Sequence, residues 1–189
     1  MYNVKKIGYI VMRKREFRDS ELWKNWRAVI TKTTCAYCAS LDGKILSADD
    51  LNGIKPPPVH PNCKCAIEAL KAIKAGTATD DGMNGEDMYI SLYGELPDCY
   101  IDSKSAQNLG WEKLDGNLAE VLPGRIIGGD IFENRKRKLP EKAGRIWYEA
   151  DFDYESGYRN SCRVLYSNDG LVFVTYDHYM SFYEIVMEE

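Results

Sequence analysis

Hydrophobic residues recur every three or four positions in part of the first third of the chain, which is the spacing of an amphipathic helix. Residues 19–30 begin with an aspartate that can cap a helix, and they place Leu22, Trp26 and either Val29 or Ile30 on one face. The pattern therefore predicts a short helix over residues 19–30 with that face buried.

A second helix is predicted over residues 66–75, where alanines and lysines surround isoleucine and leucine and Gly76 ends the run. The following residues, 76–85, are small, polar and aperiodic, which is typical of a linker. We therefore expect a first unit at 1–75, a linker at 76–85 and a second unit at 86–189.

The second unit changes from helix-like to strand-like patterns along its length. Helices are predicted over 86–93 and 104–109, and alternation takes over after residue 125. Strands are predicted at 145–154, 163–167 and 171–176, with Asn168-Asp169-Gly170 as a hairpin turn between the last two. Helices followed by strands predict an α+β fold, in which N-terminal helices pack on a twisted antiparallel β-sheet. A small Cys/His-rich helical module is expected to precede this fold in the chain.

Charge divides the chain in the same way. Residues 1–80 hold 14 Lys and Arg against 8 Asp and Glu, about +6, and residues 81–189 hold the remaining 11 against 21, about −10. A basic unit favours polyanionic partners, although ordinary surfaces also differ by this much. No stretch approaches the ~20 apolar residues of a membrane span. The first residues show no signal peptide, so we expect synthesis in the cytoplasm.

Four of the six cysteines gather in one region together with a histidine. The candidate metal ligands are Cys35, Cys38, His60, Cys63 and Cys65. A two-residue gap lets two thiolates bind one tetrahedral ion, so the first four form the most natural structural zinc site, with Cys65 as a substitute. Disulfides or reduced, buried thiols are the alternatives, whereas Cys99 and Cys162 are expected to be free thiols.

This region also resembles a known family. The runs Thr34-Cys-Ala-Tyr-Cys-Ala-Ser-Leu-Asp-Gly-Lys44 and Pro57-Pro-Val-His-Pro-Asn-Cys-Lys-Cys65 are similar to the C-terminal part of phage Mu F-like minor head proteins. The resemblance covers roughly residues 26–70. It implies a module of phage structural or delivery origin without catalytic chemistry of its own.

A different chemistry is indicated in the second unit. Glu149 lies in an alternating strand, Arg159 and Arg163 follow it, and His178 comes at the end of a later strand. RNA cleavage at a phosphodiester needs a base for the 2′-hydroxyl, an acid for the 5′-oxygen and cations for the phosphorane. These four residues meet that need without a metal or other cofactor.

Residues 89–185 resemble barnase-like bacterial ribonucleases of the microbial N1/T1 family. The matching runs include Leu96-Pro-Asp, Ile127-Gly-Gly-Asp-Ile-Phe-Glu-Asn-Arg135, Glu149-Ala-Asp, Ser156-Gly-Tyr-Arg-Asn-Ser and Asp177-His-Tyr179. The resemblance implies that Glu149 is the general base, that His178 is the general acid, and that Arg159 and Arg163 bind the phosphate.

The same resemblance implies a base-binding site. Phe132 and Tyr179 would stack on the base, and the backbone at Asn134 and Arg135 would form hydrogen bonds with it. The reaction would be transesterification to a 2′,3′-cyclic phosphate followed by slower hydrolysis.

Three features depart from the family pattern. The family's catalytic lysine arrives one position late, as Lys104, so its reach to the phosphate is in question, because one residue on a helix is a turn of roughly 100°. Lys136 replaces a glutamate that recognises guanine, which weakens the expected guanine preference. The unit is also acidic, so attraction of RNA must come from a local basic rim or from the first unit.

Together these patterns predict an endoribonuclease toxin or effector with RNA as substrate. We expect a cognate immunity protein, barstar-like by resemblance, and handling by a phage or secretion delivery system that takes the protein to the cytoplasm of a target cell. Two other classes are open: a phage-derived structural protein with an inactive nuclease fold, and a zinc-based nucleic-acid-binding adaptor.

Overall fold

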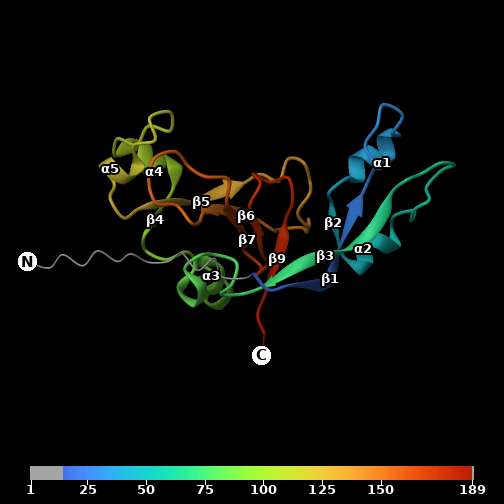
Figure 1. The fold of residues 1–189 in the computed structure, drawn as a ribbon, viewed down its shortest axis with the longest axis horizontal. Coiled ribbons are helices and arrows are strands. Elements are labelled where there is room, and N and C mark those ends of the chain that lie inside the picture. The colour runs from blue at the N-terminus through green and yellow to red at the C-terminus, as the bar shows by residue number, and fades with distance from the viewer. Residues whose placement is uncertain (1–14, 189) are drawn as a thin grey trace, which may run out of the picture.

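The computed structural model describes residues 15–188, which form a nine-stranded mixed sheet flanked by short helices (Figure 1). The strands are β1 (Phe17–Arg27), β2 (Ile45–Leu46), β3 (Ala66–Lys74), β4 (Tyr100–Ile101), β5 (Ile126–Phe132), β6 (Trp147–Asp151), β7 (Arg163–Ser167), β8 (Val172–Thr175) and β9 (Tyr183–Val186). Their order is β2-β1-β3-β9-β8-β7-β6-β5-β4. Neighbours are antiparallel except for the parallel pairs β3–β9 and β4–β5. Residues 1–14, the beginning of the first predicted unit, lie outside the described residues. The expectation that they contain no signal peptide therefore concerns a segment that the structure does not describe.

The helices are short and lie at the ends and on one side of the sheet (Figure 1). They are α1 (Ala36–Leu41), α2 (Ala48–Asn52), the 3-10 turn η1 (Gly82–Asn84), α3 (Glu86–Tyr93), α4 (Ser103–Asn108) and α5 (Leu118–Val121). The helices predicted near 86–93 and 104–109 and the hairpin at Asn168-Asp169-Gly170 are confirmed. The α+β class is confirmed as well, and the described residues contain no helix long and apolar enough to cross a membrane.

The predicted helix over 19–30 is wrong, because this segment contains most of β1. Trp26 is fully buried as expected, but Leu22, Val29 and Ile30 are exposed. The register of β1 on β3 jumps between Asp19 and Lys24, where Ser20 folds back to accept hydrogen bonds from the amides of Leu22 and Trp23. This bulge places Trp23 and Trp26 on buried faces at a spacing of three, which imitates a helical period.

The predicted helix over 66–75 is also wrong, because Ala66–Lys74 form β3. Alanine and lysine favour helices, but β3 has β1 on one side and β9 on the other, and their hydrogen bonds outweigh that preference. Leu70 and Ile73 are buried. The Cys/His-rich unit is therefore a small three-stranded part of the sheet with two short helices, and it is not a helical module.

Residues 76–85 are packed against the second unit and do not form a free spacer. The buried Asp87 carboxylate accepts hydrogen bonds from the amides of Gly76 (2.7 Å) and Ala78 (3.1 Å). The hydroxyl of Tyr176 donates to the carbonyl of Ala78 at 2.7 Å. Gly76 has φ +78°, a left-handed conformation that glycine adopts without strain.

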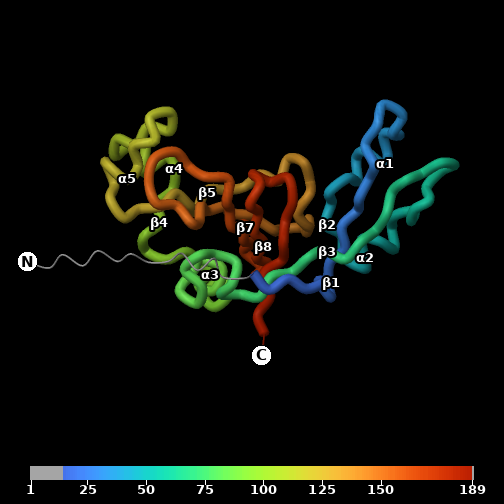
Figure 2. Tube along the Cα trace, in the orientation of Figure 1, coloured from blue at the N-terminus to red at the C-terminus, as the bar shows by residue number. Residues whose placement is uncertain are grey.

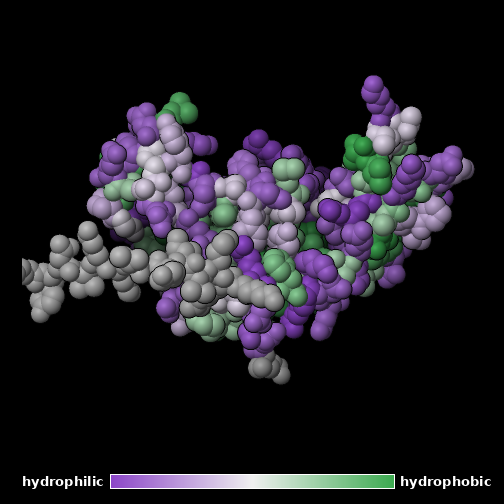
Figure 3. Space-filling view, viewed as in Figure 1, coloured by the Kyte–Doolittle hydropathy of each residue, from purple (hydrophilic) through white to green (hydrophobic). Residues whose placement is uncertain are grey.

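The first unit extends from the sheet as an arm at one end of the molecule. Figure 2 shows β1 and β3 running side by side away from the ribbons of β7 and β8, with the loops around α1 and before β3 projecting beyond them. In Figure 3 the face over the strands is mostly hydrophilic, and hydrophobic side chains show on the arm near α1. The core is continuous across the two units, since Trp23, Ile45 and Leu70 pack with Trp147 and Phe173.

The turn between β7 and β8 is tied to the chain before β6 by an ion pair. Arg145 donates from Nε and Nη2 to the two carboxylate oxygens of Asp169, each at 2.8 Å. These hydrogen bonds hold the pKa of Asp169 well below its usual range. A carboxyl with a lowered folded-state pKa stabilises the fold above its unfolded pKa and loses that contribution as the pH falls.

We expect Asp169→Asn to lower the free energy of unfolding by about 1–2 kcal/mol at pH 7. The difference should shrink as the pH falls below about 4, where the carboxyl of the unfolded chain takes up a proton. Urea denaturation at pH 7 and pH 3 measures both values, with the exposed Asp115→Asn as a control. A loss that is the same at both pH values would contradict the assignment.

Candidate active site and cysteine cluster

Two hollows lie side by side over the sheet and share three residues: Glu149 on β6, and His178 and Tyr179 in the turn after β8. The larger hollow has a volume of about 580 Å³ and the smaller one about 450 Å³. The smaller hollow is otherwise polar and basic, with Lys113, Arg159, Asn160, Ser161 and Arg163 in its wall. Glu149 and His178 therefore stand where the two hollows meet.

The turn that carries His178 is held in an unusual backbone conformation. His178 and Tyr179 have φ values of +55° and +68°. Thr175 Oγ1 accepts a hydrogen bond from the amide of Tyr179 at 3.0 Å, and Asp177 Oδ1 accepts one from the amide of Met180 at 3.0 Å. These contacts stabilise left-handed residues that would otherwise be strained, and they place both side chains in the hollows.

Tyr179 connects the turn to the strand that carries Glu149. Its hydroxyl donates to Glu149 Oε2 at 2.5 Å. Burial, together with this carboxylate, raises the pKa of Tyr179, so the phenol keeps its proton and orients the Glu149 carboxylate.

Both arginines are held by a single buried carboxylate, that of Asp151 on β6. Arg159 donates from Nε and Nη2 to its two oxygens at 2.7 Å each, and Arg163 Nε lies 2.8 Å from Oδ1. Asp151 is 0% exposed and Arg163 is 3% exposed. Burial acts to lower the pKa of Arg159, but Asp151 outweighs it and raises that pKa. Two positive charges therefore stay fixed beside Glu149.

The larger hollow has an aromatic wall and a loop that closes on itself. The rings of Phe132 and Tyr179 stack with centroids 5.1 Å apart and an angle of 24°. Asn134 shapes the loop, since its side chain donates to the carbonyl of Leu139 and accepts from the amide of Leu139. Arg135 and Lys136 line the same hollow. This arrangement offers a stacking surface and polar backbone to a planar base.

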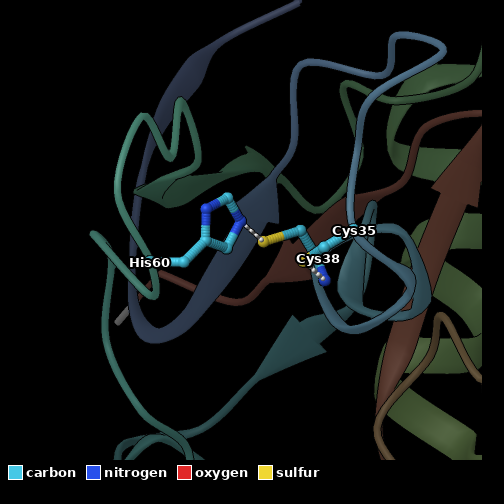
Figure 4. A group of neighbouring side chains, drawn as sticks. All are labelled: Cys35, Cys38 and His60. Atoms are coloured by element: carbon cyan, nitrogen blue, oxygen red, sulfur yellow. Dashed lines mark hydrogen bonds between the residues drawn. The ribbon is translucent and has the colours of Figure 1, made fainter.

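A second cluster, in the arm, brings together the five predicted metal ligands. Cys35 caps α1, Cys38 lies in that helix, and His60 and Cys63 come from the loop before β3. The Sγ atom of Cys38 is 3.5 Å from His60 Nε2, a contact drawn in Figure 4, and 3.9 Å from Cys63 Sγ. Ligand atoms of Cys35, Cys38 and His60 lie within 4.8 Å of one another, as do those of Cys38, Cys63 and Cys65.

His60 is oriented toward the sulfurs by the backbone of the next residue, Pro61. Its Nδ1 donates to the carbonyl of Pro61 at 2.9 Å, which leaves the free electron pair of Nε2 facing Cys38. Hydrogen bonds from the backbone at Val59 and Cys65 lower the pKa of Cys63 to about 6. All six cysteines are free thiols, as predicted for Cys99 and Cys162.

Comparison with known proteins finds two family models that match the chain. A family model described as ribonuclease matches residues 86–186, and one described as Phage Mu protein F like protein matches residues 10–68. The chain belongs to the ribonuclease family.

Among characterised proteins, ribonucleases of three bacilli are similar to residues of this unit. The enzyme of Heyndrickxia coagulans is 52% identical over 97 residues, which cover 51% of this chain and 89% of that protein. The ribonucleases of Bacillus intermedius and Bacillus pumilus are also 52% identical over 97 residues, but the match spans only 60% of their length.

The ribonuclease unit brings together eight of the nine side chains predicted for catalysis and base binding. Glu149, His178 and Tyr179 share both hollows, the two arginines line one of them, and Phe132, Asn134 and Arg135 line the other. The exception is Lys104, which is exposed on α4 and is absent from the walls of both hollows. Its position therefore gives no support to a role in binding the phosphate.

Two residues at the hollows of the ribonuclease unit were missed by sequence reasoning. Lys113 lines the hollow that holds the arginines, whereas Lys104 does not. Lys113 lies in a turn with no motif around it, so no signal in the sequence singles it out. Asp151 could have been found, because it lies two residues after Glu149 in the same alternating strand.

The hollows of the ribonuclease unit are basic although the unit as a whole is acidic. Their walls carry six Lys and Arg side chains, namely Lys113, Arg135, Lys136, Lys138, Arg159 and Arg163, against Glu133 and Glu149. The structure therefore has a local basic rim beside Glu149 and His178, one of the two sources of RNA attraction expected from the sequence.

Proposed function

We propose that this protein is a metal-independent endoribonuclease that cleaves single-stranded RNA by transesterification. Glu149 removes the proton of the 2′-hydroxyl, whose oxygen attacks the adjacent phosphorus. His178 donates a proton to the departing 5′-oxygen, and the product ends in a 2′,3′-cyclic phosphate that water hydrolyses more slowly. Arg159 and Arg163 offset the charge that builds on the phosphorane.

The proposal rests on the position of Glu149 and His178 at the junction of the two hollows. A nucleobase seated against the stacked rings of Phe132 and Tyr179 and against the Asn134 loop would place its 3′-phosphate toward the arginines. Glu149 and His178 would then lie between the nucleobase and the arginines. Because Asp151 already holds both guanidinium groups, no reorganisation is needed to receive the phosphate.

Cleavage of a short single-stranded RNA in excess EDTA tests this mechanism. We expect cleavage to persist at an undiminished rate and to leave 2′,3′-cyclic phosphate ends, which mass spectrometry of the fragments resolves. Cleavage that stops in EDTA, or that leaves 5′-phosphate ends, would contradict the proposal.

Base preference is expected to be relaxed because Lys136 lines the base hollow. A lysine only donates hydrogen bonds, whereas a carboxylate accepts them from guanine N1 and N2. We expect Lys136→Glu to raise the ratio of cleavage after guanine to cleavage after adenine by about 5- to 30-fold, the effect of one or two charged hydrogen bonds. Matched oligonucleotides with a single G or A measure this ratio, and Arg137→Glu, an exposed neighbour outside the walls of both hollows, is the control.

We also propose that the chain is a toxin or effector that acts on RNA in the cytoplasm of a target cell. The support is that a segment similar to phage Mu protein F, at residues 10–68, is joined in one chain to a ribonuclease unit at 86–186. A phage or secretion delivery system would handle such a protein, and a barstar-like immunity protein would cover the cleft in its producer.

Expression in a bacterial host tests the toxin role. Growth should stop on induction of the wild type and continue on induction of a Glu149→Gln variant, and co-expression of a small protein encoded beside the toxin gene should restore growth. Growth that continues with active wild-type enzyme in the cytoplasm would contradict it.

For the cysteine cluster we propose a structural zinc ion held by Cys35, Cys38, His60 and Cys63, with Cys65 beside them. Tetrahedral zinc with Zn–S bonds of about 2.3 Å places neighbouring ligand atoms about 3.5–3.8 Å apart. The contacts of Cys38 with His60 (3.5 Å) and with Cys63 (3.9 Å) have nearly these lengths. These two contacts fit the ion, and Cys38, which belongs to both ligand groups, would connect them and tie α1 to the loop before β3.

Metal analysis and cobalt substitution test the zinc site. We expect about one zinc per chain, and cobalt in its place should give the intense visible bands of tetrahedral thiolate coordination. Cys38→Ser should lose both signals, because Cys38 belongs to both ligand groups, whereas Cys99→Ser should keep them. Equal metal content in the two variants would contradict the assignment.

A further inference from the structure

Lys138 joins the arm to the base-binding hollow. Its backbone carbonyl accepts a hydrogen bond from the amide of Ile45 on β2 at 2.8 Å. Its side chain lines the base hollow, and Nζ donates to the carbonyl of Met180 at 2.8 Å and lies 3.4 Å from that of Tyr179. Lys138 therefore links the arm, the loop that begins at Asn134 and the turn that carries His178.

The arm also sets where the Lys138 side chain can lie. Gly43, in the tight turn before β2, has φ +73°, and its amide donates to the carbonyl of Trp26. A Cβ atom at Gly43 would lie 3.1 Å from Cε and 3.3 Å from Nζ of Lys138. The bare backbone of Gly43 is thus the surface against which Lys138 rests, and the lysine is directed from there toward Met180.

Side chains of the arm continue the core beneath the same hollow. Trp23 and Ile45 are buried with Leu139 and Phe182, and Phe132 and Tyr179, the aromatic wall of the hollow, pack against this cluster. Both segments that form the hollow therefore contact the arm. The loop contacts it by way of Lys138 and Leu139, and the turn by way of Lys138 and Phe182.

We infer that the phage Mu F-like arm is a working part of the base-binding end of the ribonuclease, and that Gly43 and Lys138 are the positioning residues through which it acts. The arm fixes the loop at 134–139 and the turn at 178–180 relative to each other, and so sets the distance between the aromatic wall and the polar backbone that grip the base. This inference rests on the proposed function, because it takes the larger hollow as the base site.

A double-mutant cycle on the full chain tests the link. The variants are Gly43→Ala, Lys138→Met and the double variant. Gly94→Ala is the matched control, because Gly94 has the same φ of +73° and a Cβ added there would meet no atom within 4 Å. We expect Gly43→Ala to raise KM for a short RNA about three- to tenfold, the effect of losing one hydrogen bond, while kcat changes less than about twofold. Gly43→Ala should add nothing in the Lys138→Met background.

Hydrogen exchange followed by mass spectrometry gives a readout that does not need activity. Peptides covering 134–139 and 178–182 should exchange faster in Gly43→Ala than in Gly94→Ala, which introduces the same backbone strain without the contact to Lys138. Equal exchange and KM in these two variants, or a Gly43→Ala effect that persists undiminished in the Lys138→Met background, would overturn the inference. Wild-type protein without cleavage would instead overturn the proposed function, and the exchange result would still decide whether the arm holds the two segments.

Discussion

Glu149→Gln and His178→Ala are each expected to lower kcat/KM for RNA by about 10²- to 10⁴-fold, the usual contribution of a positioned general base or acid. Glutamine keeps the shape of Glu149 and can still accept from the Tyr179 hydroxyl, but it cannot take the proton of the 2′-hydroxyl. Alanine at position 178 removes the proton donor for the 5′-oxygen while leaving Asp177 and Thr175 to hold the turn.

Initial rates on a short single-stranded RNA measure these losses, with melting temperatures to show that each variant is folded. Glu155→Gln is the control, because Glu155 is an exposed carboxylate outside the walls of both hollows, and its rate should match the wild type. The double variant should lose little more kcat/KM than the less active single variant. The effects of an acid and a base that act on one transition state are not additive. Retention of a tenth or more of the activity by either single variant would remove that residue from the mechanism.

Asp151→Ala is expected to have the largest effect on stability, a loss of about 3–5 kcal/mol, because removing one partner of a buried ion pair leaves the others uncompensated. Asp151 is fully buried and holds both Arg159 and Arg163. The same change should abolish most activity, since neither guanidinium would be held toward the phosphate. Asp151→Asn keeps the volume and one acceptor, so it should fold better while still losing the charge that fixes the arginines.

Asp153→Asn is the matched control, two residues away on the same segment. Burial raises the pKa of Asp153 to about 6, so its folded form favours the proton, and its contribution to stability is lost as the pH rises through that value. Replacing it should therefore leave stability at pH 7 unchanged or slightly improved. Urea denaturation of Asp151→Ala, Asp151→Asn and Asp153→Asn compares the three, and a loss below about 1 kcal/mol for Asp151→Ala would show that the arginines have other counter-charges.

Local features of the ribonuclease unit were predictable because short-range interactions determine them. The helix Glu86–Tyr93 ends at Gly94 in the left-handed conformation, and the Asn168-Asp169-Gly170 turn joins two adjacent strands. Such elements need only their own residues and near neighbours in the chain.

Residue types, and runs that resemble a family, predicted Glu149 and His178 as base and acid and Arg159 and Arg163 as phosphate-binding residues. That resemblance is now supported by the match over residues 86–186. The cysteine and histidine spacing likewise predicted a cluster, and the structure brings its members together.

Tertiary structure alone decided the fold of the arm. The segments at 17–27 and 66–74 have helical spacing or helix-favouring composition, but both are strands, because β3 pairs with β1 on one side and with the distant β9 on the other. The pairing partner β9 lies more than 100 residues after β3 in the chain. Periodicity within a short window of sequence therefore cannot predict this pairing.

The sequence by itself determined the chemistry of this protein: the carboxylate, the imidazole, the guanidinium groups and the sulfur ligands, each marked by its residue type and its near neighbours. Only the tertiary structure decided which cationic side chains lie at the site, since Lys113 lines the arginine hollow and Lys104 does not. It also placed the arm beneath the base hollow through Gly43 and Lys138. These contacts join segments that are far apart in the chain, and their distances follow from packing of the whole sheet.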